Sequence, residues 1–166
     1  VGDIKHSLQR IAEKATPASG DAMDGLRNTV INEMNFHKDD VSVPLKPQKI
    51  IWDLRTAMDM EDIAISDVGA HKMWMSRMFR CEYPNTCLIS NGFASIGIAV
   101  PGAIAAKLVN PDKKVVAVTG DAGFMMNSQE IETAMRLGIA IVILIWTDNA
   151  YGLIEWKQMN QFKRTS

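Results

Sequence analysis

Residues 115–123 read Val-Val-Ala-Val-Thr-Gly-Asp-Ala-Gly, a short apolar run that ends in a small-residue loop with one aspartate. Similar apolar runs stand at 63–66, 86–89 and 139–146, and segments with helical spacing separate them. β-branched runs that alternate with helices predict βαβ units and a parallel sheet covered on both faces. The expected fold class is therefore α/β, a doubly wound parallel sheet flanked by helices.

Apolar residues at helical spacing predict helices at about 48–58, 71–79 and 94–109, and a further helix that contains Ile131 and Leu137. In an open sheet of this kind, ligands bind in the loops at the carboxyl ends of the strands. We therefore expect the chemistry of this protein in the loops that follow the apolar runs.

The part of the chain that precedes this alternation is organised differently. Residues 1–36 contain two expected helices, at 4–14 and about 22–36, with a turn-forming break between them. The charged, proline-containing segment 37–47 is interpreted as a linker, and the sheet domain is expected over 48–166. The first residue is Val rather than Met, so we expect the chain to belong to a longer protein.

The composition is that of a soluble globular protein, with 47% hydrophobic and 22% charged residues. The net charge of -1 gives no electrostatic reason to expect nucleic acid or an anionic membrane as a partner. No signal peptide or membrane span is evident, which predicts a cytoplasmic protein. Cys81 and Cys87 are too few for a zinc site or a disulfide scaffold, so we expect reduced thiols.

Two of the apolar runs are followed by an aspartate: Asp121 after the run at 115–118, and Asp148 after the run at 139–146. In a doubly wound sheet these two carboxylates can point into one crevice. Carboxylate and carbonyl oxygens suit Mg²⁺, which usually keeps phosphate oxygens in its coordination shell. The competing interpretation is structural, with the segment 120–123 as a plain turn and Asp148 as part of a helix cap.

The spacing of these aspartates, 148 − 121 = 27 positions, resembles the diphosphate-and-metal motif of thiamine-diphosphate enzymes, in which Gly-Asp-Gly is followed by Asn-Asn. Three further segments, 67–74, 90–101 and 124–134, are similar to those of acetolactate synthases and occur in the family's order. The resemblance covers about residues 45–166. It implies that residues 1–36 are the tail of a middle domain with a helical connection, and that the sheet domain is incomplete at its C-terminus, because the family's domain extends further. The resemblance implies the thiamine-diphosphate-binding fold and the condensation of two pyruvates to 2-acetolactate, with release of CO₂, through a carbanion of the cofactor.

The resemblance also implies roles for individual residues. Mg²⁺ is bound by the side chains of Asp121 and Asp148 and by the backbone carbonyl of Ala150. His71 donates to a diphosphate oxygen, and Ile96 wedges beneath the cofactor and holds it in its reactive conformation. The residues expected to contact the cofactor are His71, Gly92, Ala94, Ile96, Gly120, Asp121, Ala122, Gly123, Asp148 and Tyr151.

Some positions depart from the general family pattern. Asp148 stands where many relatives have Asn, and in this the chain resembles the catabolic acetolactate synthases, which do not require FAD. The position that shapes acceptor choice holds Lys157, or Trp156 if the alignment shifts by one residue. We therefore expect thiamine diphosphate and Mg²⁺ but not FAD, and we leave the acceptor 2-keto acid open.

The family's activating glutamate lies on a separate domain, usually of a partner subunit, and no glutamate of this chain matches its motif. We therefore expect a homo-oligomer, a dimer or tetramer, in the full-length enzyme and no activity from these 166 residues alone. Two alternatives stay open. One is another thiamine-diphosphate-dependent 2-keto acid decarboxylase or a pyruvate oxidase, and the other is a Mg²⁺-binding, receiver-like signalling module.

Overall fold

The computed structural model describes residues 2–16 and 20–166, and the chain forms two compact units, 1–35 and 36–166. The first unit holds helix α1 (Ile4–Lys14) and nearly all of helix α2 (Asp21–Phe36). Asp3 caps α1, because its side chain accepts a hydrogen bond from the backbone N–H of His6 at 2.8 Å. Residues 17–19 of the break predicted between the two helices lie outside the described residues.

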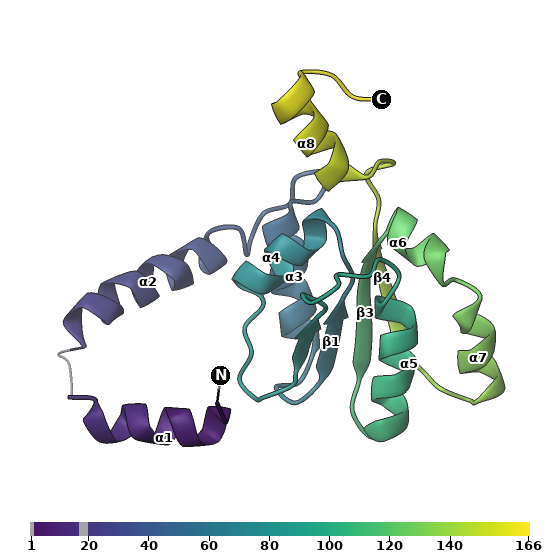
Figure 1. Ribbon diagram of the computed structural model, residues 1–166. Coiled ribbons are helices and arrows are strands. Elements are labelled where there is room, and N and C mark those ends of the chain that lie inside the picture. The colour runs from purple at the N-terminus through teal and green to yellow at the C-terminus, as the bar shows by residue number, and fades with distance from the viewer. Residues whose placement is uncertain (1, 17–19) are drawn as a thin grey trace. The chain divides into compact units, whose positions relative to one another are not determined.

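The second unit is an α/β sandwich around one parallel sheet, with the strand order β2-β1-β3-β4. Figure 1 shows α3 and α4 on one side of this sheet and α5, α6 and α7 on the other. The strands are β1 (Ile63–Ser66), β2 (Cys87–Ile89), β3 (Val115–Gly120) and β4 (Val142–Trp146). The helices are α3 (Pro47–Ala57), α4 (Ala70–Met78), α5 (Ala99–Val109), α6 (Asp121–Met126), α7 (Glu130–Arg136) and α8 (Gly152–Phe162). The predicted fold class, a parallel sheet flanked by helices, is confirmed.

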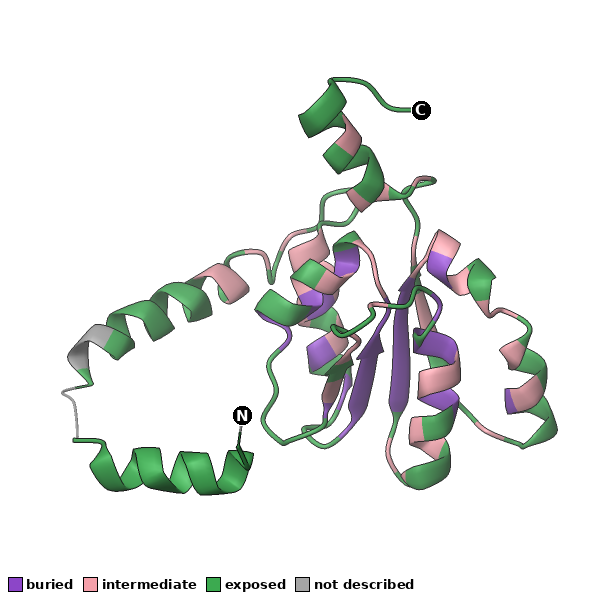
Figure 2. Ribbon diagram, in the orientation of Figure 1, coloured by how far each residue is buried: buried purple, intermediate pink, exposed green. Residues whose placement is uncertain are grey.

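The two central strands are buried along almost their whole length, and one part of the core lies between them and α5 (Figure 2). Its cluster contains Ile63, Ile65, Ala99, Ala103, Val115 and Ala117, none of them more than 5% exposed. Ile51 of α3 and Met75 of α4 are also buried. The small side chains of α5 let the helix approach the sheet closely. Burial of β-branched side chains at about 25 cal/mol per Å² is the main stabilising term here.

Three features differ from the sequence expectation. Helix α5 begins at Ala99 rather than near Ala94, because Gly97 has φ +93°, which a continuous helix does not permit. The segment after β3, expected as a loop, forms the short helix α6. The run at 139–146 was expected to be a core strand, but β4 is the edge of the described sheet and leaves Val142 59% exposed. Within the described residues, no helix combines the length and apolar character that a bilayer crossing requires.

Candidate functional site

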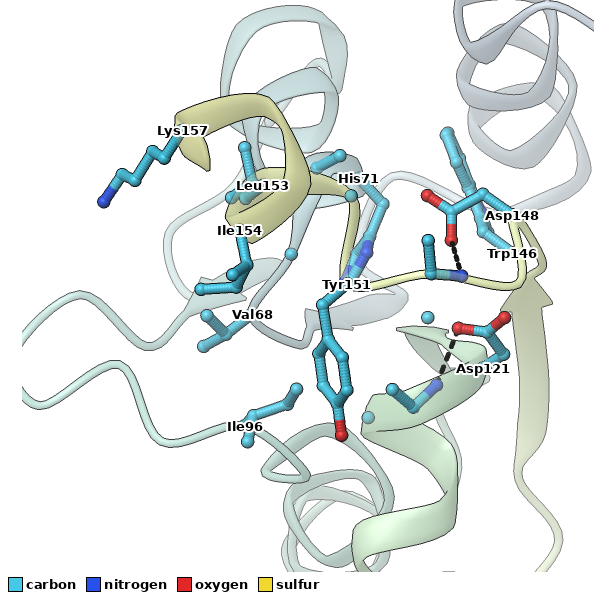
Figure 3. Close-up of a pocket in the computed structure, with 17 residues that line it drawn as sticks. Val68, His71, Ile96, Asp121, Trp146, Asp148, Tyr151, Leu153, Ile154 and Lys157 are labelled. Carbon is cyan, nitrogen blue, oxygen red and sulfur yellow. Dashed lines mark hydrogen bonds between the residues drawn. The ribbon is translucent and has the colours of Figure 1, made fainter. Parts of the chain in front are cut away.

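A cavity of about 610 Å³ lies at the carboxyl ends of β1, β3 and β4, the edge of the sheet where ligands bind in such folds (Figure 3). Loops after three strands, the start of α8 and one residue of the loop before α5 contribute to its wall. Most of the wall is apolar, and the polar groups are few. The lining residues are Val68, Gly69, Ala70, His71, Ile96, Gly120, Asp121, Ala122, Gly123, Trp146, Asp148, Ala150, Tyr151, Gly152, Leu153, Ile154 and Lys157.

Asp121, the first residue of α6, joins the loops that follow β3 and β4. Its Oδ1 accepts from the backbone N–H of Ala122 at 2.7 Å, and its Oδ2 accepts from the backbone N–H of Asn149 at 3.0 Å. Asn149 has φ +59°, a conformation that Asn tolerates better than most residues. The structure thus brings the two motifs, separate in sequence, into direct contact through this carboxylate.

Asp148 lies across the cavity mouth from Asp121 on the exposed loop after β4 (Figure 3). Its Oδ1 accepts from the backbone N–H of Ala150 at 3.2 Å. A Cβ at position 152 would lie only 2.6 Å from the Asp148 Oδ2, so Gly152 gives this carboxylate its room. The sequence analysis did not single out Gly152, although a glycine four positions after an aspartate is a weak signal of such close packing.

Asp121, Asp148 and the Ala150 carbonyl offer some, but not all, of the oxygen ligands that a small hard cation requires. Among the described residues there is no group of three or more His, Cys, Asp or Glu side chains that could hold a metal ion. Asp121 and Asp148 nevertheless line one cavity together with Ala150. Two carboxylates and one carbonyl suit a Mg²⁺ that takes its other ligands from phosphate and water.

His71, at the start of α4, is 4% exposed, and its Nε2 atom has no hydrogen-bond partner among the described residues. Burial lowers the pKa of His71 from its usual 6.5, although the nearby Asp67 acts in the opposite direction. A buried polar nitrogen without a partner is costly, and the residue that carries it belongs to the cavity lining. The Nε1 atom of Trp146 is also buried and unpartnered, and its ring centroid lies 6.2 Å from that of His71. These two orphaned atoms support a polar ligand group at this end.

The loop before α5 contributes one predicted contact residue to the cavity and leaves two outside its lining. Ile96 lines the cavity and is 36% exposed, so its side chain faces the space rather than the core. Gly92 and Ala94 are not among the lining residues. Ala94 has φ +51°, a left-handed conformation that costs a non-glycine residue about 1–2 kcal/mol.

Helix α8 and the residue before it form the remaining wall. Tyr151 and Lys157 line the cavity, as do Leu153 and Ile154. Trp156 is 63% exposed and, unlike Lys157, is not among the lining residues. The exposed side chain of Lys157 extends from the cavity rim in Figure 3.

The two cysteines lie away from this cavity, and both are free thiols. Burial and the neighbouring Cys81 raise the pKa of the Cys87 thiol to about 12. Cys87 is therefore a neutral thiol at physiological pH, whereas Cys81 is exposed.

Sequence comparison identifies the family to which this arrangement belongs. The profile of the family "Thiamine pyrophosphate enzyme, C-terminal TPP binding domain" matches residues 67–166, which contain every cavity residue named above. The chain belongs to this family of thiamine pyrophosphate (thiamine diphosphate) enzymes. The match confirms the predicted cofactor class and fold, and it does not support a receiver-like module.

Individual relatives point to one group within the family. The chain is 44% identical over 120 residues to "Acetolactate synthase" of Bacillus subtilis (strain 168), which covers 72% of this chain and 21% of that protein. It is 36% identical over 148 residues to "Probable acetolactate synthase large subunit" of Methanococcus aeolicus, and the match covers 86% of this chain and 24% of that protein. It is 30% identical over 181 aligned residues to "Acetolactate synthase, catabolic" of Raoultella terrigena, and the match covers 100% of this chain and 31% of that protein. The chain thus spans between 21% and 31% of the length of these relatives.

Proposed function

We propose that the protein carrying this chain is an acetolactate synthase, which condenses two pyruvates to 2-acetolactate and releases CO₂. The observation that carries the proposal is the junction of the two loops at Asp121, which links Gly120–Gly123 and Asp148–Ala150 at one cavity. The relatives named acetolactate synthase supply the reaction. The whole reaction is a proposal because the chain spans only part of those proteins.

The cavity residues divide into a polar end and an apolar end. At the polar end Asp121, Asp148 and the Ala150 carbonyl would hold Mg²⁺, and His71 would meet a diphosphate oxygen with its unpartnered Nε2. The backbone of Gly120, Ala122 and Gly123 lines the same end and permits close approach of that group. This arrangement would hold the charged end of thiamine diphosphate.

The apolar end is where the reacting part of the cofactor would lie. Thiamine diphosphate supplies the electron sink for decarboxylation of a 2-keto acid. Val68, Ile96 and Ile154 would exclude water from that region, and Ile96 would press on the cofactor by shape. A dry surrounding strengthens every electrostatic interaction with the reacting carboxylate.

The finer assignments rest on particular positions of the chain. Asp148 and the sequence similarity to a catabolic relative support the catabolic type, for which FAD is not expected. We further propose a cytoplasmic homo-oligomer, in which a partner subunit supplies the activating glutamate. Lys157 at the cavity rim would influence the choice of acceptor.

The test is product analysis with the full-length protein, thiamine diphosphate, Mg²⁺ and pyruvate. Acetolactate as the main product supports the proposal, whereas acetaldehyde or acetyl phosphate would assign the protein to the decarboxylases or the pyruvate oxidases. A parallel assay without added FAD checks the expected independence of that cofactor. Turnover that requires added FAD would contradict the catabolic assignment.

A further inference from the structure

Asp67 is a buried carboxylate that none of the roles above uses. It directly follows β1 and is 0% exposed. Its backbone N–H donates to the carbonyl of Val118 at 2.8 Å, so it continues the pairing of β1 with β3 by one residue. A buried carboxylate is costly unless hydrogen bonds compensate it fully. The reason for its burial must therefore lie in its partners.

Four donors surround this carboxylate, and they come from three different segments. Oδ1 accepts from the backbone N–H groups of Val68 at 2.7 Å and Gly97 at 2.8 Å. Oδ2 accepts from the backbone N–H of Ala99 at 3.2 Å, and the Thr119 hydroxyl lies 3.2 Å from it. That hydroxyl shares its one proton between Asp67 and the Gly120 carbonyl, which is 3.1 Å away. No described residue forms an ion pair with Asp67 that would explain its charge. Its charge instead meets the amino end of α5, where the helix dipole favours an anion.

These three segments lie next to residues of the candidate site on the β1 and β3 side of the cavity. Val68 leads to His71, Gly97 follows Ile96, and Thr119 precedes the loop that carries Asp121. A single carboxylate therefore fixes the spacing between the shape-determining residue, the buried histidine and the metal-binding loop.

Two glycines show how closely this region is packed. A Cβ at position 123 would lie 2.8 Å from the Thr119 Oγ1 and 3.2 Å from the Asp67 Oδ2. Gly97 reaches the carboxylate with φ +93°, where a Cβ would lie 2.7 Å from the Cβ of Met126. Gly123 is thus required by the packing around Asp67, and Gly97 by its positive φ and by the closeness of Met126.

We propose that Asp67 is a positioning residue for the cofactor site: its carboxylate holds the Ile96 loop, the segment before His71 and the Thr119–Gly123 loop in their relative places. This inference rests on the proposed function, since it concerns binding of thiamine diphosphate. It differs from a purely structural role, because a structural residue would affect stability without a specific effect on cofactor affinity.

The test compares two buried aspartates at the two ends of β1. Asp62 is 5% exposed, accepts from the backbone N–H groups of Asp59 at 2.7 Å and Lys114 at 2.9 Å, and does not line the cavity. Asp67→Asn and Asp62→Asn each place an amide where N–H donors converge, so both should lower the unfolding temperature of the full-length protein. The dissociation constant of thiamine diphosphate at saturating Mg²⁺, measured by calorimetry, separates them.

We expect Asp67→Asn to raise this dissociation constant about 10- to 100-fold, as is typical when a partner that orients ligand-binding groups is lost. Asp62→Asn should leave it within about twofold. Equal constants for the two variants would overturn the proposal and make Asp67 a residue of the fold alone. If the wild-type protein itself does not bind thiamine diphosphate, the proposed function fails, and this inference fails with it.

A second variant keeps the proposal testable if Asp67→Asn does not fold. Thr119→Val removes one of the four donors, preserves side-chain shape and leaves the carboxylate in place. A rise in the dissociation constant of thiamine diphosphate that is smaller than the rise in Asp67→Asn supports the positioning role. An unchanged constant in this variant would overturn it.

Discussion

The two walls of the cavity are built in different ways. The inner wall, which we define as Val68–His71 and Gly120–Gly123, follows the central strands β1 and β3. The buried residues Asp67 and Thr119 directly precede its two segments. The outer wall, Asp148–Lys157, follows the edge strand β4 and is mostly exposed. The inner wall is fixed by many hydrogen bonds, whereas the outer wall is joined to it through the Asn149 N–H and the Asp121 carboxylate. The inner wall therefore resembles a preformed half-site, and the outer wall a surface that a ligand and its metal would complete.

The largest effect is expected from Asp121→Ala, because Asp121 serves both walls. The change removes a proposed metal ligand and also the acceptor for the Asn149 N–H at 3.0 Å. We expect Mg²⁺-dependent binding of thiamine diphosphate by the full-length protein to weaken by more than about 100-fold, beyond the usual effect of residues that only support metal ligands. Calorimetric titration with and without Mg²⁺ measures this, and retention of Mg²⁺-dependent binding would contradict the assignment.

Ile96→Ala tests the apolar end, next to the inner wall. Ile96 is 36% exposed, so truncation opens no buried cavity and should change the free energy of unfolding by less than about 1 kcal/mol. Turnover at saturating cofactor should fall by up to about 100-fold, because the reacting groups lose their orientation. Cofactor affinity should change much less.

Ile65→Ala is a matched control for this variant, since Ile65 is 5% exposed and lies in the core. It should destabilise the protein by about 2–5 kcal/mol. If Ile96→Ala abolishes cofactor affinity while the bound form turns over normally, the role assigned to Ile96 is wrong.

The sequence was sufficient to predict the sheet and the positions of Asp121 and Asp148 after its strands. It was not sufficient to predict the hydrogen bonds that hold the inner wall. Apolar runs predict buried strands because they follow from local composition, and the spacing of Asp121 and Asp148 is visible in the chain. The bond from the Gly97 N–H to Asp67 joins residues thirty positions apart and has no local signature. For the same reason the start of α5 was misplaced, since its position depends on Gly97 and on Asp67 rather than on helix propensity.

A pair of glycine substitutions compares the rigidity of the two walls. In Gly123→Ala the new Cβ meets the buried Thr119 and Asp67 at 2.8 and 3.2 Å, which cannot move without breaking hydrogen bonds. We expect a loss of about 1–3 kcal/mol in the free energy of unfolding, as for overpacking elsewhere. In Gly152→Ala the new Cβ meets the Asp148 Oδ2 at 2.6 Å, and this exposed carboxylate can swing away. The loss in the free energy of unfolding there should stay below about 1 kcal/mol. Urea unfolding of both full-length variants measures the two losses. Equal losses would mean that the two walls are equally rigid.

The smallest effect is expected from Asp148→Asn, on the outer wall. An amide oxygen can replace the carboxylate as a metal ligand, and it can still accept from the Ala150 N–H, which now lies 3.2 Å from the Asp148 Oδ1. Because the side chain is exposed, loss of its charge changes little in its solvation. We expect the dissociation constant of thiamine diphosphate in Mg²⁺ to change by less than about fivefold, or about 1 kcal/mol. Asp148→Ala, which offers no oxygen, should weaken binding clearly more, and a loss in Asp148→Asn as large as in Asp121→Ala would show that both walls depend on charge alone.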